Sequence, residues 1–210
     1  MHHLPCKPPP ATYIAVMTQT APYVLAFGDS LTAGYGLPAA SSFAAQLQTA
    51  LRTRFPAAAV HNAGVSGDTT AGGLKRLAPV LTRLQRRPDL VIVELGANDL
   101  LRGFAPEQTR ANLDEILHQL ARCNLPTLLT TFEAPPFLGA LRARYQSMYA
   151  GLATKHGIAT APFFPPNVLG HPDLVLADRL HPNARAIELV VAALMPAVCS
   201  ALMRSHSEAA

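Results

Sequence analysis

The chain has 210 residues, 50% of them hydrophobic and 14% charged, so it can form one folded domain and is not disordered. Its 17 lysine and arginine residues against 13 acidic residues give a net charge of +4, and the basic residues form no run or stripe. This distribution argues against a nucleic-acid-binding protein, and no apolar stretch reaches the roughly 18 residues expected of a membrane span.

The first 20 residues are expected to be a flexible, proline-rich extension, because residues 8–10 are all proline. The apolar segment at residues 13–17 is too short for the core of a signal peptide, which favours a cytoplasmic location over a periplasmic or secreted one. His2 and His3 lie near a cysteine, but nothing in this segment would hold a metal geometry, so we expect no metal site.

The three cysteines, Cys6, Cys123 and Cys199, are odd in number, widely spaced and without a C-x-x-C pair. This pattern excludes a zinc module with cysteine ligands and argues against a disulfide framework. Free thiols in a reducing compartment are the expected state.

After the extension, short apolar runs alternate with longer segments of helical spacing. In chain order we expect a strand at 23–27, a helix from Ser41 or Ser42 to 54, a strand at 58–61, a helix from 69 or 70 to 87, a strand at 90–95, a helix from 106, a strand at 126–131, a helix at 138–156, a strand at 158–161, a proline-rich loop at 163–176 and a helix at 183–203 that bends at Pro196. The alternation predicts a single-domain, flavodoxin-like α/β sandwich over residues 21–204, followed by a tail at 205–210. About five parallel strands would form the central sheet, with helices on both faces.

In a parallel sheet, the loops that follow the strands meet at the carboxyl edge, where ligands bind. The residues that follow the first three strands include Ser30, Gly67 and Asn98, and the segment before the last helix contains Asp178 and His181. A serine, a histidine, an aspartate and nearby N–H donors are the groups that acyl transfer through a covalent serine intermediate requires.

Four sequence blocks, GDSLTAGYG, SGDTT, VELGANDLLRGF and D-x-x-HPN, follow one another in this order. On these blocks the chain resembles the GDSL or SGNH hydrolases over residues 23–202, most of all their bacterial acyl-CoA thioesterases, lysophospholipases and arylesterases. The resemblance implies hydrolysis of carboxylic esters and thioesters of small acyl substrates through an acyl-Ser30 intermediate, without a metal or organic cofactor. It also implies an oxyanion hole made of the Ser30 and Gly67 N–H groups and the Asn98 amide.

The residues support these roles on chemical grounds. A neutral His181 is suited to take the Ser30 proton, and Asp178, three positions earlier, can fix its tautomer. Gly67 and Asn98 have an alternative reading as turn residues. The neighbouring acids Asp29, Asp68 and Asp99 are expected to cap helices or brace loops, and Ser66 is the rival nucleophile.

Apolar residues in two of the rim loops are candidates for an acyl-binding groove, with simple loop packing as the alternative. They are Leu100, Leu101, Phe104, Pro135, Phe137 and Leu138. A carbohydrate or peptidoglycan O-acetyl esterase of the same family is the alternative activity, and a catalytically silent binding module is the alternative outside enzymes. The G-x-G-x-x-G, G-K-[ST] and G-x-S-x-G motifs of other α/β proteins are absent from the sequence.

Overall fold

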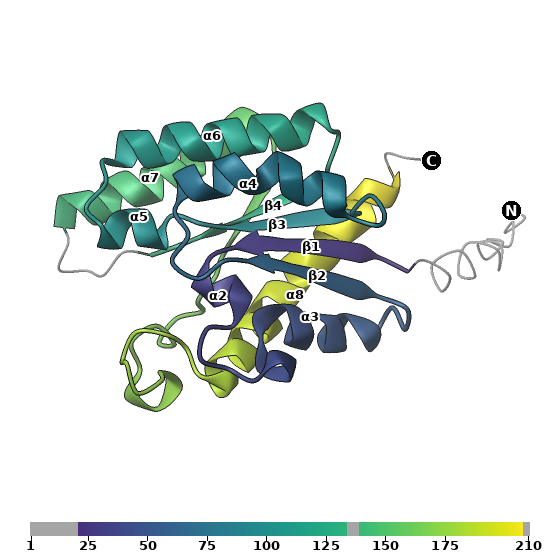
Figure 1. The fold of residues 1–210 in the computed structure, drawn as a ribbon, viewed down its shortest axis with the longest axis horizontal. Coiled ribbons are helices and arrows are strands. Elements are labelled where there is room, and N and C mark those ends of the chain that lie inside the picture. The colour runs from purple at the N-terminus through teal and green to yellow at the C-terminus, as the bar shows by residue number, and fades with distance from the viewer. Residues whose placement is uncertain (1–20, 134–138, 208–210) are drawn as a thin grey trace, which may run out of the picture.

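The computed structural model of the protein describes residues 21–133 and 139–207 (Figure 1). Its centre is a sheet of five parallel strands in the order β2-β1-β3-β4-β5. The strands are β1 (Tyr23–Gly28), β2 (Ala59–Gly64), β3 (Leu90–Glu94), β4 (Thr127–Thr131) and β5 (Ala159–Pro162). The expected parallel α/β sandwich is confirmed.

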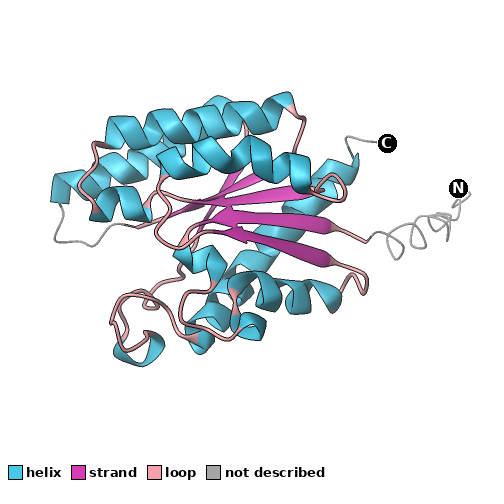
Figure 2. Ribbon diagram, in the orientation of Figure 1, coloured by secondary structure: helices cyan, strands magenta, loops and turns pink. Residues whose placement is uncertain are grey.

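Helices cover both faces of this sheet (Figure 2). The helices are α2 (Ser30–Ala33), α3 (Phe43–Arg52), α4 (Thr70–Arg83), α5 (Ala97–Leu101), α6 (Pro106–Arg122), α7 (Gly139–His156) and α8 (Ala184–Ser207), with 3-10 turns η1 (Ala39–Ser41) and η3 (Pro172–Leu174). Helices α4, α6 and α7 lie on one face, and α3 and α8 lie on the other. Because all the strands are parallel, their carboxyl ends lie at one edge of the sheet, beside α2, α5 and the loop before α8.

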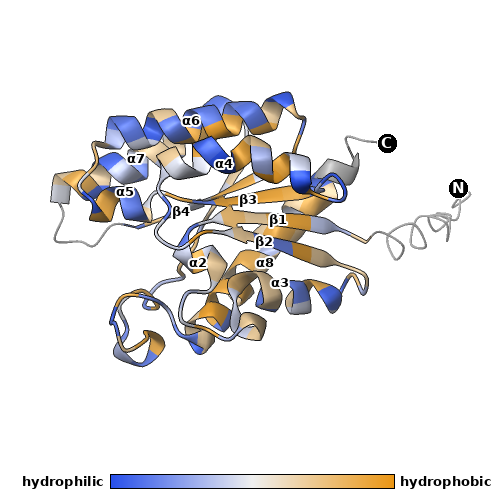
Figure 3. Ribbon diagram, in the orientation of Figure 1, coloured by the Kyte–Doolittle hydropathy of each residue, from blue (hydrophilic) through white to orange (hydrophobic). Residues whose placement is uncertain are grey.

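Each strand sends alternate side chains to two separate cores. In β1, Leu25 and Phe27 pack under α4, α6 and α7, whereas Val24 and Ala26 pack against α3 and α8. All five residues of β3 are buried, as expected for a central strand with helices on both faces. Figure 3 shows the apolar residues of β1 and β3 and the polar residues on the outward side of α6.

The helix expected at residues 69 or 70 to 87 ends at Arg83, four residues earlier than predicted. Leu84 already has an extended backbone and closes the helix. Arg86 then donates to the Ala21 carbonyl, and Arg87 donates to the carbonyls of Cys123 and Asn124. These two arginines therefore hold the chain segments at the amino edge of the sheet together.

Helix α8 is longer than expected and continues without interruption past Pro196 to Ser207, three residues into the expected tail. Its segment from Ala184 to Arg204 is long and apolar enough to cross a membrane by length and composition alone, which the sequence reading did not find. Half of its most apolar window is buried inside the protein. Ile187 and Leu194 lie in the core beneath the sheet, so packing accounts for this apolar character.

The expected extension at residues 1–20 lies outside the described residues, as do the three residues after Ser207. Cys123 is exposed and Cys199 is buried, both as free thiols, whereas Cys6 lies outside the described part.

Candidate active site

Ser30 lies at the point where β1 passes into the short helix α2. Strand β1 ends at Gly28, Asp29 caps the helix by accepting a hydrogen bond from the Leu31 N–H (3.0 Å), and Ser30 is the first helical residue. The first N–H groups of a helix have no intrahelical acceptor, so the Ser30 N–H is left for another partner. Sequence analysis expected Asp29 to cap a helix or brace a loop, and the structure confirms the cap.

A hairpin-like turn before α8 presents Asp178 and His181. Val175 pairs with Pro182 in an antiparallel bridge, and the Leu176 N–H donates to the His181 carbonyl (2.8 Å). Asp178 fixes the turn from within, because its Oδ1 accepts the backbone N–H groups of Leu180 and His181, both at 3.0 Å.

Asp178, His181 and Ser30 lie in one hydrogen-bonded line. Asp178 Oδ2 lies 2.7 Å from His181 Nδ1, and His181 Nε2 lies 3.1 Å from Ser30 Oγ. Because a carboxylate accepts, Nδ1 carries the proton of the neutral ring and Nε2 is free to accept from the serine hydroxyl. Hydrogen bonds from the Leu180 backbone N–H, the His181 ring and the His181 N–H lower the pKa of Asp178 to about 2, which keeps it ionised beside the imidazole.

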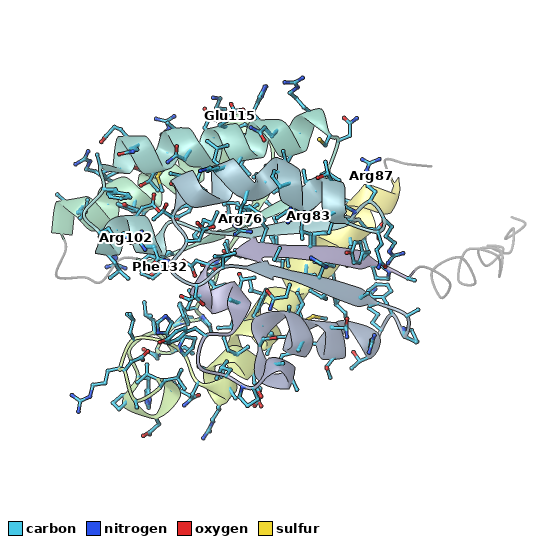
Figure 4. All side chains as sticks on the ribbon, in the orientation of Figure 1. Arg76, Arg83, Arg87, Arg102, Glu115 and Phe132 are labelled. Carbon is cyan, nitrogen blue, oxygen red and sulfur yellow. The ribbon has the colours of Figure 1, made fainter. Side chains whose placement is uncertain are left out.

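Gly67 lies in the loop after β2, at a backbone conformation that only glycine adopts readily. Its φ is +77°, in a turn closed by the Asp68 N–H and the Val65 carbonyl (3.0 Å). The Gly67 carbonyl accepts a hydrogen bond from Arg102 (2.6 Å), a residue just after α5 that Figure 4 shows at the same end of the sheet. This contact holds the turn in place.

Asn98 comes from α5, directly after β3. Its amide nitrogen donates one N–H to Asp29 Oδ2 at 2.9 Å, and an amide has a second N–H to give. Asn98, Gly67 and Ser30 all line the same cleft.

This cleft has a volume of about 720 Å³, within the usual range for small-molecule sites. Of the apolar residues expected to line it, Leu100 and Leu101 do so, whereas Phe104 does not. The sequence pattern placed Phe104 in the groove because it follows the same loop, but it lies past the end of α5. Pro135, Phe137 and Leu138 lie outside the described residues.

Sequence analysis missed several residues that line the cleft. They are Leu31, Tyr35, Phe132, Phe164, Leu169, Arg179 and Leu180. Phe132 directly follows β4 (Figure 4), so the rule that carboxyl ends of strands meet at one edge would have found it. Tyr35 packs against the His181 ring with 4.3 Å between centroids, a contact between distant segments that no sequence pattern reveals.

The remaining acids near the rim have structural partners. Asp68 pairs with Arg76 (2.6 Å), and Asp99 accepts from the Thr70 N–H (2.9 Å) and hydroxyl. Within the described ranges, no three histidine, cysteine or acidic side chains are grouped so that they could hold a metal ion.

A parallel sheet with serine, histidine and aspartate in line at its carboxyl edge defines the class of serine hydrolases. The sequence profile of the GDSL-like lipase/acylhydrolase family matches residues 26–188. The chain belongs to this family and is therefore an acyl-hydrolysing enzyme.

Individual relatives are similar over most of the chain. An arylesterase of Vibrio mimicus is 36% identical over 177 residues, 82% of this chain and 86% of that protein. The thioesterase 1/protease 1/lysophospholipase L1 of Escherichia coli K12 is 35% identical over 181 residues, 84% and 85% of the two chains. The solved structure of AlinE4, an SGNH-hydrolase family esterase, has a TM-score of 0.72 at 48% identity and covers 87% of this chain and 97% of its own.

Proposed function

We propose that the protein hydrolyses carboxylic esters and thioesters of acyl substrates through an acyl intermediate on Ser30. The observation that carries this proposal is the line from Asp178 through His181 to Ser30, with contacts of 2.7 Å and 3.1 Å. His181 takes the Ser30 proton as the hydroxyl attacks the acyl carbonyl, and later gives a proton to the departing alcohol or thiol. Water then attacks the acyl-serine by the same route, with Asp178 stabilising the imidazolium that forms in each step.

The negative charge that develops on the carbonyl oxygen needs donors aimed at it. We assign this role to the backbone N–H groups of Ser30 and Gly67 and to the side-chain amide of Asn98. Support comes from their common position in the cleft and from the left-handed turn at Gly67, which allows a ligand to approach the backbone closely.

The lining of the cleft favours an acyl chain over a sugar as the group bound. Most of the residues around Ser30 are apolar, including Leu100, Leu101, Phe132 and Phe164. The names of the relatives, arylesterase and thioesterase/lysophospholipase, point to the same substrates. A chain-length series of p-nitrophenyl esters and acyl-CoAs, run beside acetylated sugars, tests this choice, and a preference for the sugars would contradict it.

Replacement of the nucleophile tests the mechanism. Ser30→Ala should fold normally, lose at least about 10³-fold in kcat on p-nitrophenyl acetate, and gain no mass from a fluorophosphonate. The control is Ser147→Ala, which removes an exposed hydroxyl on α7 and should label like the wild type. Labelling that persists in Ser30→Ala would contradict the proposal and make Ser66 the next nucleophile to test.

A further inference from the structure

Two carboxyl groups are buried directly beneath the proposed oxyanion hole, and the hydrolysis mechanism uses neither of them. Asp29 is 1% exposed and Glu94, the last residue of β3, is 3% exposed. Buried carboxyl groups are costly unless they are hydrogen-bonded or neutralised, so each needs a physical account.

The two Asp29 oxygens accept hydrogen bonds from the Asn98 amide, which is a proposed oxyanion donor, and from the backbone N–H that follows Ser30. Oδ1 accepts the Leu31 N–H at 3.0 Å, which fixes the first turn of α2 and with it the direction of the Ser30 N–H. Oδ2 accepts one N–H of the Asn98 amide at 2.9 Å, which fixes the direction of the other. The Asp29 side chain thus orients the Asn98 amide by a direct hydrogen bond and the Ser30 N–H through the first turn of α2.

Glu94 contacts the backbone of Asp29, whereas Leu31 and Asn98 contact the Asp29 carboxylate. Its Oε2 accepts the Asp29 backbone N–H at 3.2 Å and the Thr32 hydroxyl at 2.9 Å. A Cβ on Gly28 would lie 2.6 Å from this Oε2, so only glycine at that position lets the carboxyl group approach the end of β1. The end of β1 therefore packs directly against the Glu94 carboxyl group.

The two carboxyl groups also contact each other, and their surroundings decide where the proton lies. Complete burial, and next the negative charge of Asp29, raise the pKa of Glu94 well above its ordinary value. Burial raises the pKa of Asp29 as well, but hydrogen bonds from Leu31, Glu94 and Asn98 oppose that rise. A protonated Glu94 that donates to an ionised Asp29 satisfies both groups.

The neighbouring charges do not neutralise a second carboxylate. Arg76 of α4 donates to the Gly28 carbonyl, next to Asp29, at 2.8 Å but is paired with Asp68. Burial raises the pKa of Tyr149 of α7, which is close enough that the charges of Glu94 and Asp29 raise it further, and its hydroxyl donates to the Leu95 carbonyl at 2.9 Å. Asp99, from α5, is a further buried acid whose charge also raises the pKa of Tyr149.

We propose that Asp29 and Glu94 share one proton and act as a positioning pair, which aims the Asn98 amide and the Ser30 N–H at the oxyanion. The proposal rests on the proposed function, because it concerns the donors of that mechanism. Loss of the shared proton leaves two adjacent carboxylates below the oxyanion hole. Their repulsion displaces Asp29 from Asn98, and their charge opposes the charge that develops on the substrate oxygen.

Glu94→Gln is the central test, because a glutamine amide donates to Asp29 at every pH. At alkaline pH, wild-type kcat on a p-nitrophenyl ester should fall as the pH rises, with KM little changed, because the donors act mainly in the transition state. Glu94→Gln should keep kcat within about threefold at neutral pH and should lose this alkaline fall. An alkaline fall that is identical in Glu94→Gln would overturn the proposal.

A double-mutant cycle tests whether Asp29 acts through Asn98. Loss of one oxyanion donor typically lowers the rate about 10²–10³-fold, which is the loss expected in kcat for Asn98→Ala. Asp29→Asn should cost at least tenfold less in the Asn98→Ala background than in the wild type. Fully additive losses would show that the two residues act independently and would contradict the positioning role.

Infrared difference spectra measure the proton without any catalysis. The C=O stretch of a protonated carboxylic acid should be present at neutral pH in the wild type and in Ser30→Ala, and absent from Glu94→Gln. Absence of this band in the wild type would refute the proposed shared proton, even if Glu94→Gln fails to fold. Activity that survives in Ser30→Ala would instead refute the proposed function and leave this band unchanged, so the two failures are distinguishable.

Discussion

Asp178 joins two tasks in one side chain. Its Oδ1 holds the backbone of the turn through the Leu180 and His181 N–H groups, and its Oδ2 receives the imidazole N–H. An asparagine at this position can keep the first task, since its carbonyl oxygen still accepts both backbone bonds. It cannot keep the second, because its NH₂ group donates where the carboxylate accepted.

Asp178→Asn should therefore leave the fold intact and lower kcat by on the order of 10³–10⁴, because the ring is turned to the wrong tautomer. The melting temperature and kcat, measured on the same preparation, check this. The Asp178 side chain is partly exposed, so its replacement should cost little stability. A large loss of melting temperature with little loss of kcat would show that Asp178 serves only the turn.

At the scale of whole elements, the strands and long helices could be predicted from sequence, because their signals are periodic and local. The short helices α2 and α5 could not, since four or five residues are too few to show a helical period. Both helices begin just after a strand, where their residues contact the loop that follows the neighbouring strand. Asn98 of α5, for example, donates to Asp29, which follows β1. Their structure is set by these tertiary contacts and not by propensity.

Helix α8 has the composition of a membrane span but packs as a core helix. Substitutions at a buried and an exposed position of α8 test whether its apolar residues stabilise the folded core. Leu194 is completely buried against the sheet, whereas Leu189, on the same helix, is 41% exposed. Leu194→Ala should lower the free energy of unfolding by about 2–5 kcal/mol, because it leaves a cavity in the core. Leu189→Ala should change it by no more than about 0.5 kcal/mol in the same urea titration. Equal effects of the two substitutions would contradict a buried role for α8.

At the scale of the whole molecule, the position of the site could be predicted because a parallel sheet collects the loops that follow its strands at one edge. Ser30, Asn98 and His181 were placed there from order and spacing alone, and all three line the cleft. What could not be predicted was the layer beneath them. Glu94 reads in the sequence as one polar residue in an apolar strand, and nothing local shows that Gly28 and Thr32 leave room for its carboxyl group.

The raised pKa of Glu94 should make the stability of the whole protein depend on pH. In the unfolded chain a glutamic acid releases its proton near pH 4.3, so above about pH 5 the folded chain holds a proton that the unfolded chain has lost. The free energy of unfolding should therefore fall as the pH rises, by at most about 1.4 kcal/mol per pH unit, until Glu94 itself ionises in the folded state. The lowered pKa of Asp178 acts in the opposite sense and at lower pH, because its contribution is present above about pH 4 and is lost as the pH falls toward 2.

Glu94→Gln has no proton to retain, so its stability should vary less with pH than that of the wild type between about pH 5 and pH 8. Urea unfolding at several pH values measures this slope. The matched control is Glu115→Gln, which makes the same change in charge on the exposed face of α6 (Figure 4) and should keep the wild-type slope. A slope in Glu94→Gln equal to that of the wild type and the control would mean that Glu94 is already ionised in the folded protein.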